Sequence, residues 1–226
     1  MMYKSCIFDL DGTLTDTLES LTYSVNLTMK EMGLPGITKE QCRMFVGNGS
    51  KVLLEHSLRA GSEQAITRLE EAMEIYARVF DQNCMYQVMP YPGIEQLLRL
   101  LEQKGIQSAV LSNKPDRQAV HVVESVFGKD RFCHIQGQKP DVPRKPDPTA
   151  ACMIAERLGS TAEETIYIGD SEVDIQTGHA AGMRTIGVSW GFRSRACLEE
   201  AGAKYIAETP EEIFALISAW EEEKGR

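Results

Sequence analysis

The sequence predicts an α/β protein in which helices cover both faces of a parallel sheet and a group of helices is inserted after the first strand. An apolar, β-prone run at residues 3–8 ends at an acidic cluster, which indicates a buried strand. Residues 17–80 show apolar side chains spaced by three and four, without strand-like alternation. After residue 94, helix-length segments alternate with short apolar runs, a pattern typical of a parallel sheet.

The inserted segment is predicted to be helical throughout. Its apolar spacing is clear at Val25, Met29 and Met32, and glycine-containing stretches at 33–36 and 47–49 separate the helices. The proline-rich stretch at 89–93 marks the return to the sheet. We therefore predict a core domain made of residues 1–16 and 84–226, and an inserted helical domain made of residues 17–83.

The remainder of the chain is predicted to alternate between helices and strands. The expected helices span residues 94–103, 116–127, 148–158, 173–181 and 211–222. The expected strands span residues 107–111, 132–135, 165–168, 184–188 and 205–206. Helices of this length between consecutive strands favour right-handed crossovers and parallel pairing.

Charge and composition exclude several classes of partner. The 226 residues include 24 Lys and Arg against 33 Asp and Glu, a net charge of −9. That charge argues against binding to a nucleic-acid backbone or to anionic lipid. No apolar run approaches the ~20 residues of a membrane span, and Asp9 comes too early for a signal peptide. Six scattered cysteines without a CxxC pair are typical of a cytoplasmic protein. The sequence does not distinguish a monomer from a homodimer.

Polar and charged residues follow the predicted strands, at the sheet edge where ligands bind in open α/β folds. These residues lie at 9–16, 112–115, 144–147 and 169–174. Asp9 and Asp11 directly follow an apolar strand, where two carboxylates are costly without a cation between them. Oxygen ligands without histidine or thiolate suit Mg²⁺. Three other acids are interpreted as helix-cap or turn residues: Asp16, Asp116 and Asp147.

Four motifs follow one another along the chain: DLDGTLTD at 9–16, LSNKP at 111–115, RKPDP at 144–148 and GDSEVD at 169–174. In this order they resemble the haloacid dehalogenase-like superfamily of phosphohydrolases over essentially the whole chain. The resemblance implies a Rossmann-like parallel-sheet core with an inserted α-helical cap domain. It also implies an Mg²⁺-dependent phosphatase that acts on a small phosphorylated metabolite.

The same resemblance implies a role for each motif residue. Asp9 is expected to attack phosphorus and form an aspartyl-phosphate, Asp11 to act as acid and then base, and Lys145 to neutralise charge in the transition state. Asp170 is expected to bind Mg²⁺ with Asp9 and the Asp11 carbonyl, and Asp174 to support the metal or orient Lys145. Three residues are expected around the phosphoryl oxygens, the first of them also holding the loop: Thr13, Ser112 and Asn113.

The segment at 43–50 resembles the corresponding segment of bacterial phosphoglycolate phosphatases, which makes 2-phosphoglycolate the expected substrate. Gly47, Asn48 and Gly49 are then expected to approach the substrate, with Arg43 or Lys51 pairing with its carboxylate. A plain turn between helices, with both basic side chains in solvent, is an equally open alternative.

Other functions also remain open at this point. Asp11 argues against a dehalogenase, because a halide leaving group needs no proton. Sugar phosphomutases of the superfamily carry a histidine where this chain has Leu21, which disfavours that activity. A phosphatase for sugar phosphates, nucleotides or pyrophosphate, and a non-catalytic phosphate-binding protein, are the remaining alternatives.

Overall fold

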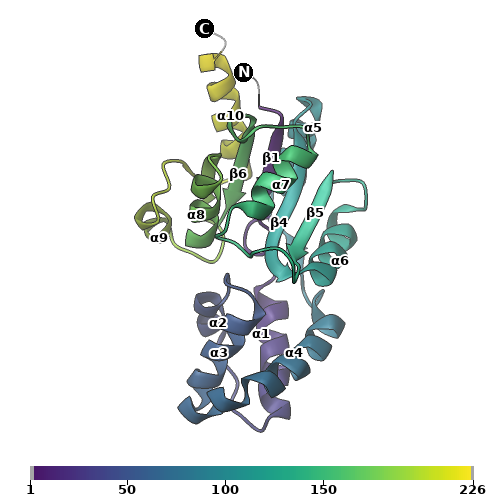
Figure 1. Cartoon of the computed structure of the whole chain (residues 1–226), viewed down its shortest axis with the longest axis vertical. Coiled ribbons are helices and arrows are strands. Elements are labelled where there is room, and N and C mark those ends of the chain that lie inside the picture. The colour runs from purple at the N-terminus through teal and green to yellow at the C-terminus, as the bar shows by residue number, and fades with distance from the viewer. Residues whose placement is uncertain (1–2, 225–226) are drawn as a thin grey trace.

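Six parallel strands form the central sheet of the protein. The structure is a computed structural model that describes residues 3–224. The strand order is β5-β4-β1-β6-β7-β8, so the first strand lies in the middle and β4 and β6 flank it (Figure 1). The strands are β1 (Ser5–Phe8), β4 (Gln107–Pro115), β5 (His134–Gln138), β6 (Thr165–Gly169), β7 (Arg184–Val188) and β8 (Ile206–Ala207).

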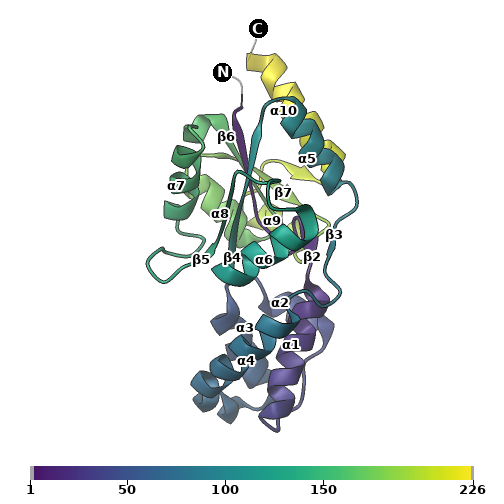
Figure 2. The ribbon, with the colours of Figure 1, turned by 90° about the vertical axis from the view of Figure 1, so that its right-hand side faces the viewer.

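Helices cover both faces of this sheet (Figure 2). Successive side chains of β1 point to opposite faces: Phe8 belongs to the apolar cluster shared with α5, α6 and α10, and Ile7 to the cluster shared with α7. The helices that flank the sheet are α5 (Ile94–Gln103), α6 (Asp116–Phe127), α7 (Thr149–Arg157), α8 (Glu172–Ala180) and α10 (Pro210–Lys224). The short α9 (Arg195–Glu200) follows β7, and a 3-10 turn, η2 (Ala162–Glu164), precedes β6. This arrangement confirms the predicted α/β fold class.

The inserted segment forms a bundle of helices beyond the carboxyl ends of the strands (Figures 1 and 2). Its elements are α1 (Leu18–Glu31), α2 (Lys39–Phe45), α3 (Ser50–Gly61), η1 (Glu63–Arg68) and α4 (Leu69–Asn83). Fully buried apolar side chains such as Met29, Leu54 and Phe80 hold these helices together. The chain enters and leaves the bundle through a small antiparallel pair, β2 (Thr15–Asp16) with β3 (Met89–Pro90).

The structure differs from the sequence prediction in four places. The strand expected at 107–111 continues to Pro115, because hydrogen bonds and ion pairs bury Asn113 and Lys114 although both are polar. The β2–β3 pair and α9 were not predicted, since two-residue strands and a six-residue helix contain too few residues for a periodic pattern. The strand expected at 132–135 is shifted to His134–Gln138.

Residues 3–224 contain no helix that is both long and apolar enough to cross a membrane. All six cysteines are free thiols; Cys6, Cys42 and Cys84 are buried, whereas Cys133 and Cys152 are exposed.

Candidate active site

A cavity lies at the carboxyl edge of the sheet, between the sheet and the inserted helices. The sheet side contributes charged and polar groups, among them Asp9, Asp11, Ser112, Lys114, Lys145 and Asp170. The helical side contributes a mostly apolar wall that includes Leu21, Val46, Leu53, Tyr76 and Phe80. The motifs predicted to carry the chemistry therefore meet at one place, although they are far apart in the sequence.

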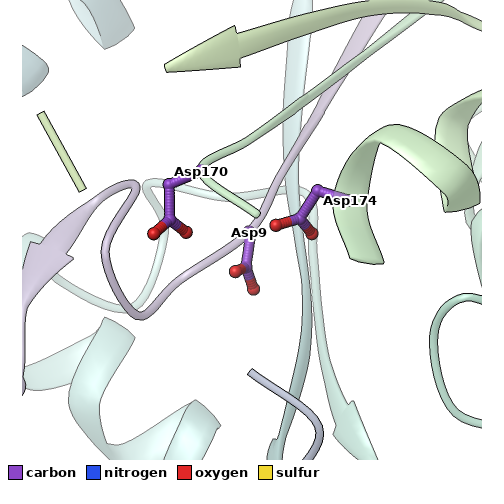
Figure 3. A group of neighbouring side chains, drawn as sticks. All are labelled: Asp9, Asp170 and Asp174. Carbon is purple, nitrogen blue, oxygen red and sulfur yellow. The ribbon is translucent and has the colours of Figure 1, made fainter. Parts of the chain in front are cut away.

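Three buried carboxylates gather beside this cavity (Figure 3). Asp9 follows β1, Asp170 follows β6, and Asp174 lies in the first turn of α8, and one oxygen of each lies within 4.8 Å of the others. The two loops leave neighbouring parallel strands, and the Asp9 amide donates to the Ile168 carbonyl at 2.8 Å, which fixes Asp9 beside Asp170. A group of this kind is expected to attract a cation.

Lys145 supplies one positive charge to this group. Its Nζ lies 2.8 Å from Asp9 Oδ1 and 2.7 Å from Asp174 Oδ1, and all three side chains are buried. Burial alone would lower the pKa of Lys145, but the carboxylates of Asp174 and Asp9 raise that pKa well above its usual value. Lys145 is therefore held as a cation against Asp9.

Both oxygens of Asp174 already have partners. Oδ1 accepts from Lys145 and, at 3.5 Å, from the hydroxyl of Tyr167. Oδ2 accepts from the amide of Ser171 at 3.1 Å and from its hydroxyl at 2.6 Å. Asp174 is thus fixed by its own helix N-terminus and in turn fixes Lys145.

Asp170 lacks an ion-pair partner among residues 3–224. Its carboxylate accepts only from the Thr13 hydroxyl at 3.2 Å and from the Phe192 amide at 2.7 Å. Burial, together with the charges of Asp174 and Asp9, raises the pKa of Asp170 well above its usual value. Burial and the Asp174 charge likewise raise the pKa of Asp9 to about 7, although Lys145 opposes the shift.

Glycines allow the loops to close around Asp170. A Cβ on Gly12, whose φ is +88°, would lie 2.4 Å from Asp170 Oδ2. A Cβ on Gly191 would lie 2.4 Å from Asp170 Cβ. Any larger side chain at either position would collide with the carboxylate group or displace it.

The two polar residues at the end of β4 have different surroundings. Ser112 lines the cavity, and its hydroxyl accepts a hydrogen bond from the Lys114 amide at 3.2 Å. The Asn113 side chain is fully used: its amide donates to the carbonyls of Gly47 and Lys145, each at 3.1 Å, and its oxygen accepts from the Lys145 amide. Asn113 thus joins the inserted helices to the segment that carries Lys145.

Asp11 and Lys114 form a second ion pair in the cavity. Lys114 Nζ lies 2.7 Å from Asp11 Oδ1, and the lysine side chain is 1% exposed. Lys114 is part of the LSNKP motif at 111–115, but its role was not predicted from the sequence. Its position offered a signal, because Lys114 lies two residues after Ser112 at the carboxyl end of the same strand. Residues there reach the same edge of the sheet as Asp11.

The segment predicted to select the substrate is only partly at the cavity. Gly47 and Gly49 line it, whereas Asn48 contributes its carbonyl to Arg144 at 3.2 Å. Arg43 is exposed and is not part of the cavity lining. Lys51 is also exposed, with its Nζ 3.9 Å from the Glu55 carboxylate.

Arg193 is a further cavity residue that the sequence analysis missed. Its guanidinium donates to the carbonyls of Arg43 and Val46, both at 2.7 Å, and to the carboxylate of Glu172 at 2.9 Å. It lies in the loop after β7, outside the four motifs, and no local pattern distinguishes it from neighbouring arginines. Thr13, expected near the phosphate, instead gives its hydroxyl to Asp170 and does not line the cavity.

Comparison with known proteins defines the class to which this fold and site belong. A model of the family described as haloacid dehalogenase-like hydrolase matches residues 6–188. The chain belongs to this family.

Individual relatives narrow the class further. The chain is 32% identical over 209 residues to the phosphoglycolate phosphatase of Pseudomonas syringae pv. syringae, covering 90% of this chain and 76% of that protein. It is 28% identical to the phosphoglycolate phosphatase of Haemophilus influenzae, covering 95% and 98% of the two chains. A crystal structure from Lactobacillus delbrueckii subsp. bulgaricus, proposed to be a phosphoglycolate phosphatase, matches with a TM-score of 0.89 and 34% identity, covering 96% and 99%. The protein is therefore a hydrolase of phosphoric monoesters.

Proposed function

We propose that the protein hydrolyses 2-phosphoglycolate through an aspartyl-phosphate formed on Asp9, with Mg²⁺ as cofactor. The observation that best supports this reaction is the position of Asp9. It is buried at the cavity with Lys145 on one side and Asp170 on the other. The relatives named phosphoglycolate phosphatase support the substrate. The small cavity and its apolar wall also favour a compact ester.

The residues present fit a divalent metal ion. Asp170 has two oxygens, a raised pKa and no ion-pair partner within the described residues. We propose that Asp9, Asp170 and the Asp11 carbonyl hold Mg²⁺, because these are hard oxygen donors. Asp174, whose oxygens are taken by Lys145, Tyr167 and Ser171, acts by orienting Lys145 instead. When bound, the ion would offset the negative charge of the carboxylates and the phosphate.

The residues of the chain account for the chemical steps. An Asp9 carboxylate oxygen forms a bond to phosphorus while the bond from phosphorus to the ester oxygen breaks. In its protonated form Asp11 gives a proton to the departing oxygen, and the resulting carboxylate then takes a proton from the water that hydrolyses the aspartyl-phosphate. Lys145 and the Ser112 hydroxyl bind the phosphoryl oxygens, and Asn113 keeps the Lys145 segment in place.

We also propose that residues 17–83 act as a cap that covers the bound substrate, with residues 1–16 and 84–226 as the catalytic core. Three core side chains hold carbonyls of the cap: Asn113, Arg144 and Arg193. Opening the cap breaks these bonds and admits the substrate, whereas closing it excludes water. Leu21 lines the cavity as part of the cap, so an apolar group occupies the position where mutases carry histidine.

Release of inorganic phosphate tests the proposal. The purified protein is incubated with 2-phosphoglycolate and a set of sugar, nucleotide and pyrophosphate substrates, with Mg²⁺ or with EDTA. We expect the highest kcat/KM for 2-phosphoglycolate, activity only with the metal, and complete loss in Asp9→Asn. Undiminished activity of Asp9→Asn contradicts the mechanism, and a clear preference for another substrate contradicts the assignment of 2-phosphoglycolate.

A further inference from the structure

The cavity is lined by three cationic side chains, and two of them each contact at least two acceptors. Lys145 contacts both Asp9 and Asp174, and Arg193 donates to Glu172 and to two backbone carbonyls. Lys114 differs from both, because Asp11 is the only acceptor that its ammonium group meets within residues 3–224. A lysine ammonium has three N–H donors, so Lys114 retains donors for another anion.

The surroundings of Lys114 strengthen its attraction for an anion. Its Nζ lies 4.9 Å from the centre of the Phe80 ring, on the cap side of the cavity. Tyr76 and Leu53 continue this apolar wall, and the lysine side chain is almost completely shielded from water. Charge interactions are stronger in such an environment than in solvent. The exposed Arg43 and Lys51 lack this shielding.

We infer that Lys114 binds a second anionic group of the substrate, a carboxylate attached close to the phosphoryl group. The inference rests on the proposed phosphatase function and assigns the selection of the substrate to the core rather than to Arg43 or Lys51. Asp11 and Lys114 both line the cavity, so the ammonium group is within reach of a ligand whose phosphoryl group is at Asp9. A neutral ester of the same size leaves this interaction unused.

The discrimination between two matched esters is the first test. 2-Phosphoglycolate and its amide, 2-amino-2-oxoethyl phosphate, have the same size but differ in one negative charge. We expect the wild-type kcat/KM to favour the carboxylate by at least about tenfold. In Lys114→Met and Lys114→Gln the ratio should fall towards one, while Lys114→Arg should keep part of it. Because the ratio compares two esters on one variant, a general loss of activity cancels.

Matched controls separate Lys114 from the other cations. Lys51→Met removes an exposed lysine of the cap, and Arg43→Gln removes the arginine predicted from the sequence to meet the carboxylate. Both variants should keep the wild-type ratio. A ratio that persists in Lys114→Met and Lys114→Gln, or that collapses in Arg43→Gln or Lys51→Met instead, overturns the inference.

Binding without turnover distinguishes this inference from the proposed reaction. Calorimetry in the presence of Mg²⁺ compares 3-phosphonopropionate, in which CH₂ replaces the ester oxygen, with its neutral amide. We expect wild type to bind 3-phosphonopropionate at least about tenfold more tightly than its amide. Lys114→Gln should bind the two compounds with equal affinity. That result without any phosphate release from 2-phosphoglycolate supports Lys114 recognition while refuting the proposed reaction. Equal binding of the two compounds to wild type overturns the inference.

Discussion

At the scale of single residues, Asp174 has a different position from the other acids of the site. Its two oxygens are used by Lys145, Tyr167 and Ser171, so it is an anchor for the lysine that faces Asp9. A buried carboxylate with all its acceptors satisfied is rigid, and that rigidity is transferred to the cation it holds.

Asp174→Asn tests this role. The substitution keeps the size of the side chain but removes one of the two charges that hold Lys145, so we expect kcat to fall by roughly a hundredfold while the metal is still bound. Asp147→Asn is the matched control, because Asp147 is an exposed cap of the Thr149 amide and should leave kcat unchanged. Mg²⁺ titration of both variants checks the metal. An Asp174→Asn protein with normal kcat but a large loss of Mg²⁺ affinity would make Asp174 a metal ligand instead.

The sequence predicted the residues that belong to dense acidic motifs and missed those that act singly. Asp9, Asp11 and Asp170 each follow a predicted strand, and because ligands bind at the carboxyl edge of such a sheet, this was enough to predict that they line one cavity. Lys114 and Arg193 depend on contacts across 103 and about 150 residues of chain, which no local pattern contains. The hydrogen bond from the Asn113 side-chain amide to the Gly47 carbonyl was likewise unpredictable, since it depends on where that carbonyl lies in the fold.

At the scale of elements, the end of α2 is hydrogen-bonded to a loop on the sheet side of the cavity. Arg193 donates to the carbonyls of Arg43 and Val46 at the helix C-terminus, where a cation also complements the helix dipole. Its third contact, with Glu172, ties this connection to the first turn of α8. Arg193 therefore holds the end of α2 against the core, in addition to the contacts that Asn113 and Arg144 make with the carbonyls of Gly47 and Asn48.

Replacing Arg193 should weaken that connection. In Arg193→Gln we expect KM for the substrate to rise by roughly tenfold with a smaller change in kcat, because cap closure supplies binding energy. The matched control is Arg195→Gln, since Arg195 is exposed and, within residues 3–224, pairs only with Glu199 and Glu208. Steady-state kinetics of both variants measure the effect. Equal kinetic changes in the two variants, or none in Arg193→Gln, contradict a connecting role.

Elements with a long periodic pattern of apolar residues were predictable from the sequence. Elements that form only through contacts with distant parts of the chain were not. The apolar spacing predicted that residues 17–80 are helical, without bounds for the individual helices, and the helix expected at 94–103 coincides with α5. The last residues of β4 carry polar side chains that are buried only because Asp11, Gly47 and the Lys145 segment surround them. The β2–β3 pair exists because the chain crosses between core and cap twice at the same point.

At the scale of the whole molecule, the buried carboxylates make the stability of the fold depend on pH and on bound metal. In the metal-free protein, burial raises the folded-state pKa values of Asp9 and Asp170 above those in the unfolded chain. The folded protein therefore favours the protonated form of both acids. The stability that this form provides is fully present below the unfolded pKa of about 4. It is lost as pH rises towards and through about 7, the folded pKa of Asp9.

Thermal unfolding of Asp170→Asn against wild type, both in EDTA, measures this effect. The amide resembles the protonated acid, so the variant should be close to wild type at pH 5 and increasingly more stable than wild type towards pH 8. Saturating Mg²⁺ should reverse the order at pH 8, because only wild type has the full set of ligands. A difference between the two proteins that stays constant with pH would show that Asp170 is not destabilised by its charge.

The central claim, that Asp9 accepts the phosphoryl group, is tested most directly by trapping the intermediate. The protein is mixed with 2-phosphoglycolate and Mg²⁺, quenched within milliseconds, reduced with borohydride and digested for mass spectrometry. Because borohydride reduces an acyl phosphate to an alcohol, the account predicts homoserine at position 9, dependent on substrate and absent from Asp9→Asn. Substrate-dependent modification at another residue, or phosphate release under the same conditions with position 9 always unmodified, would contradict it.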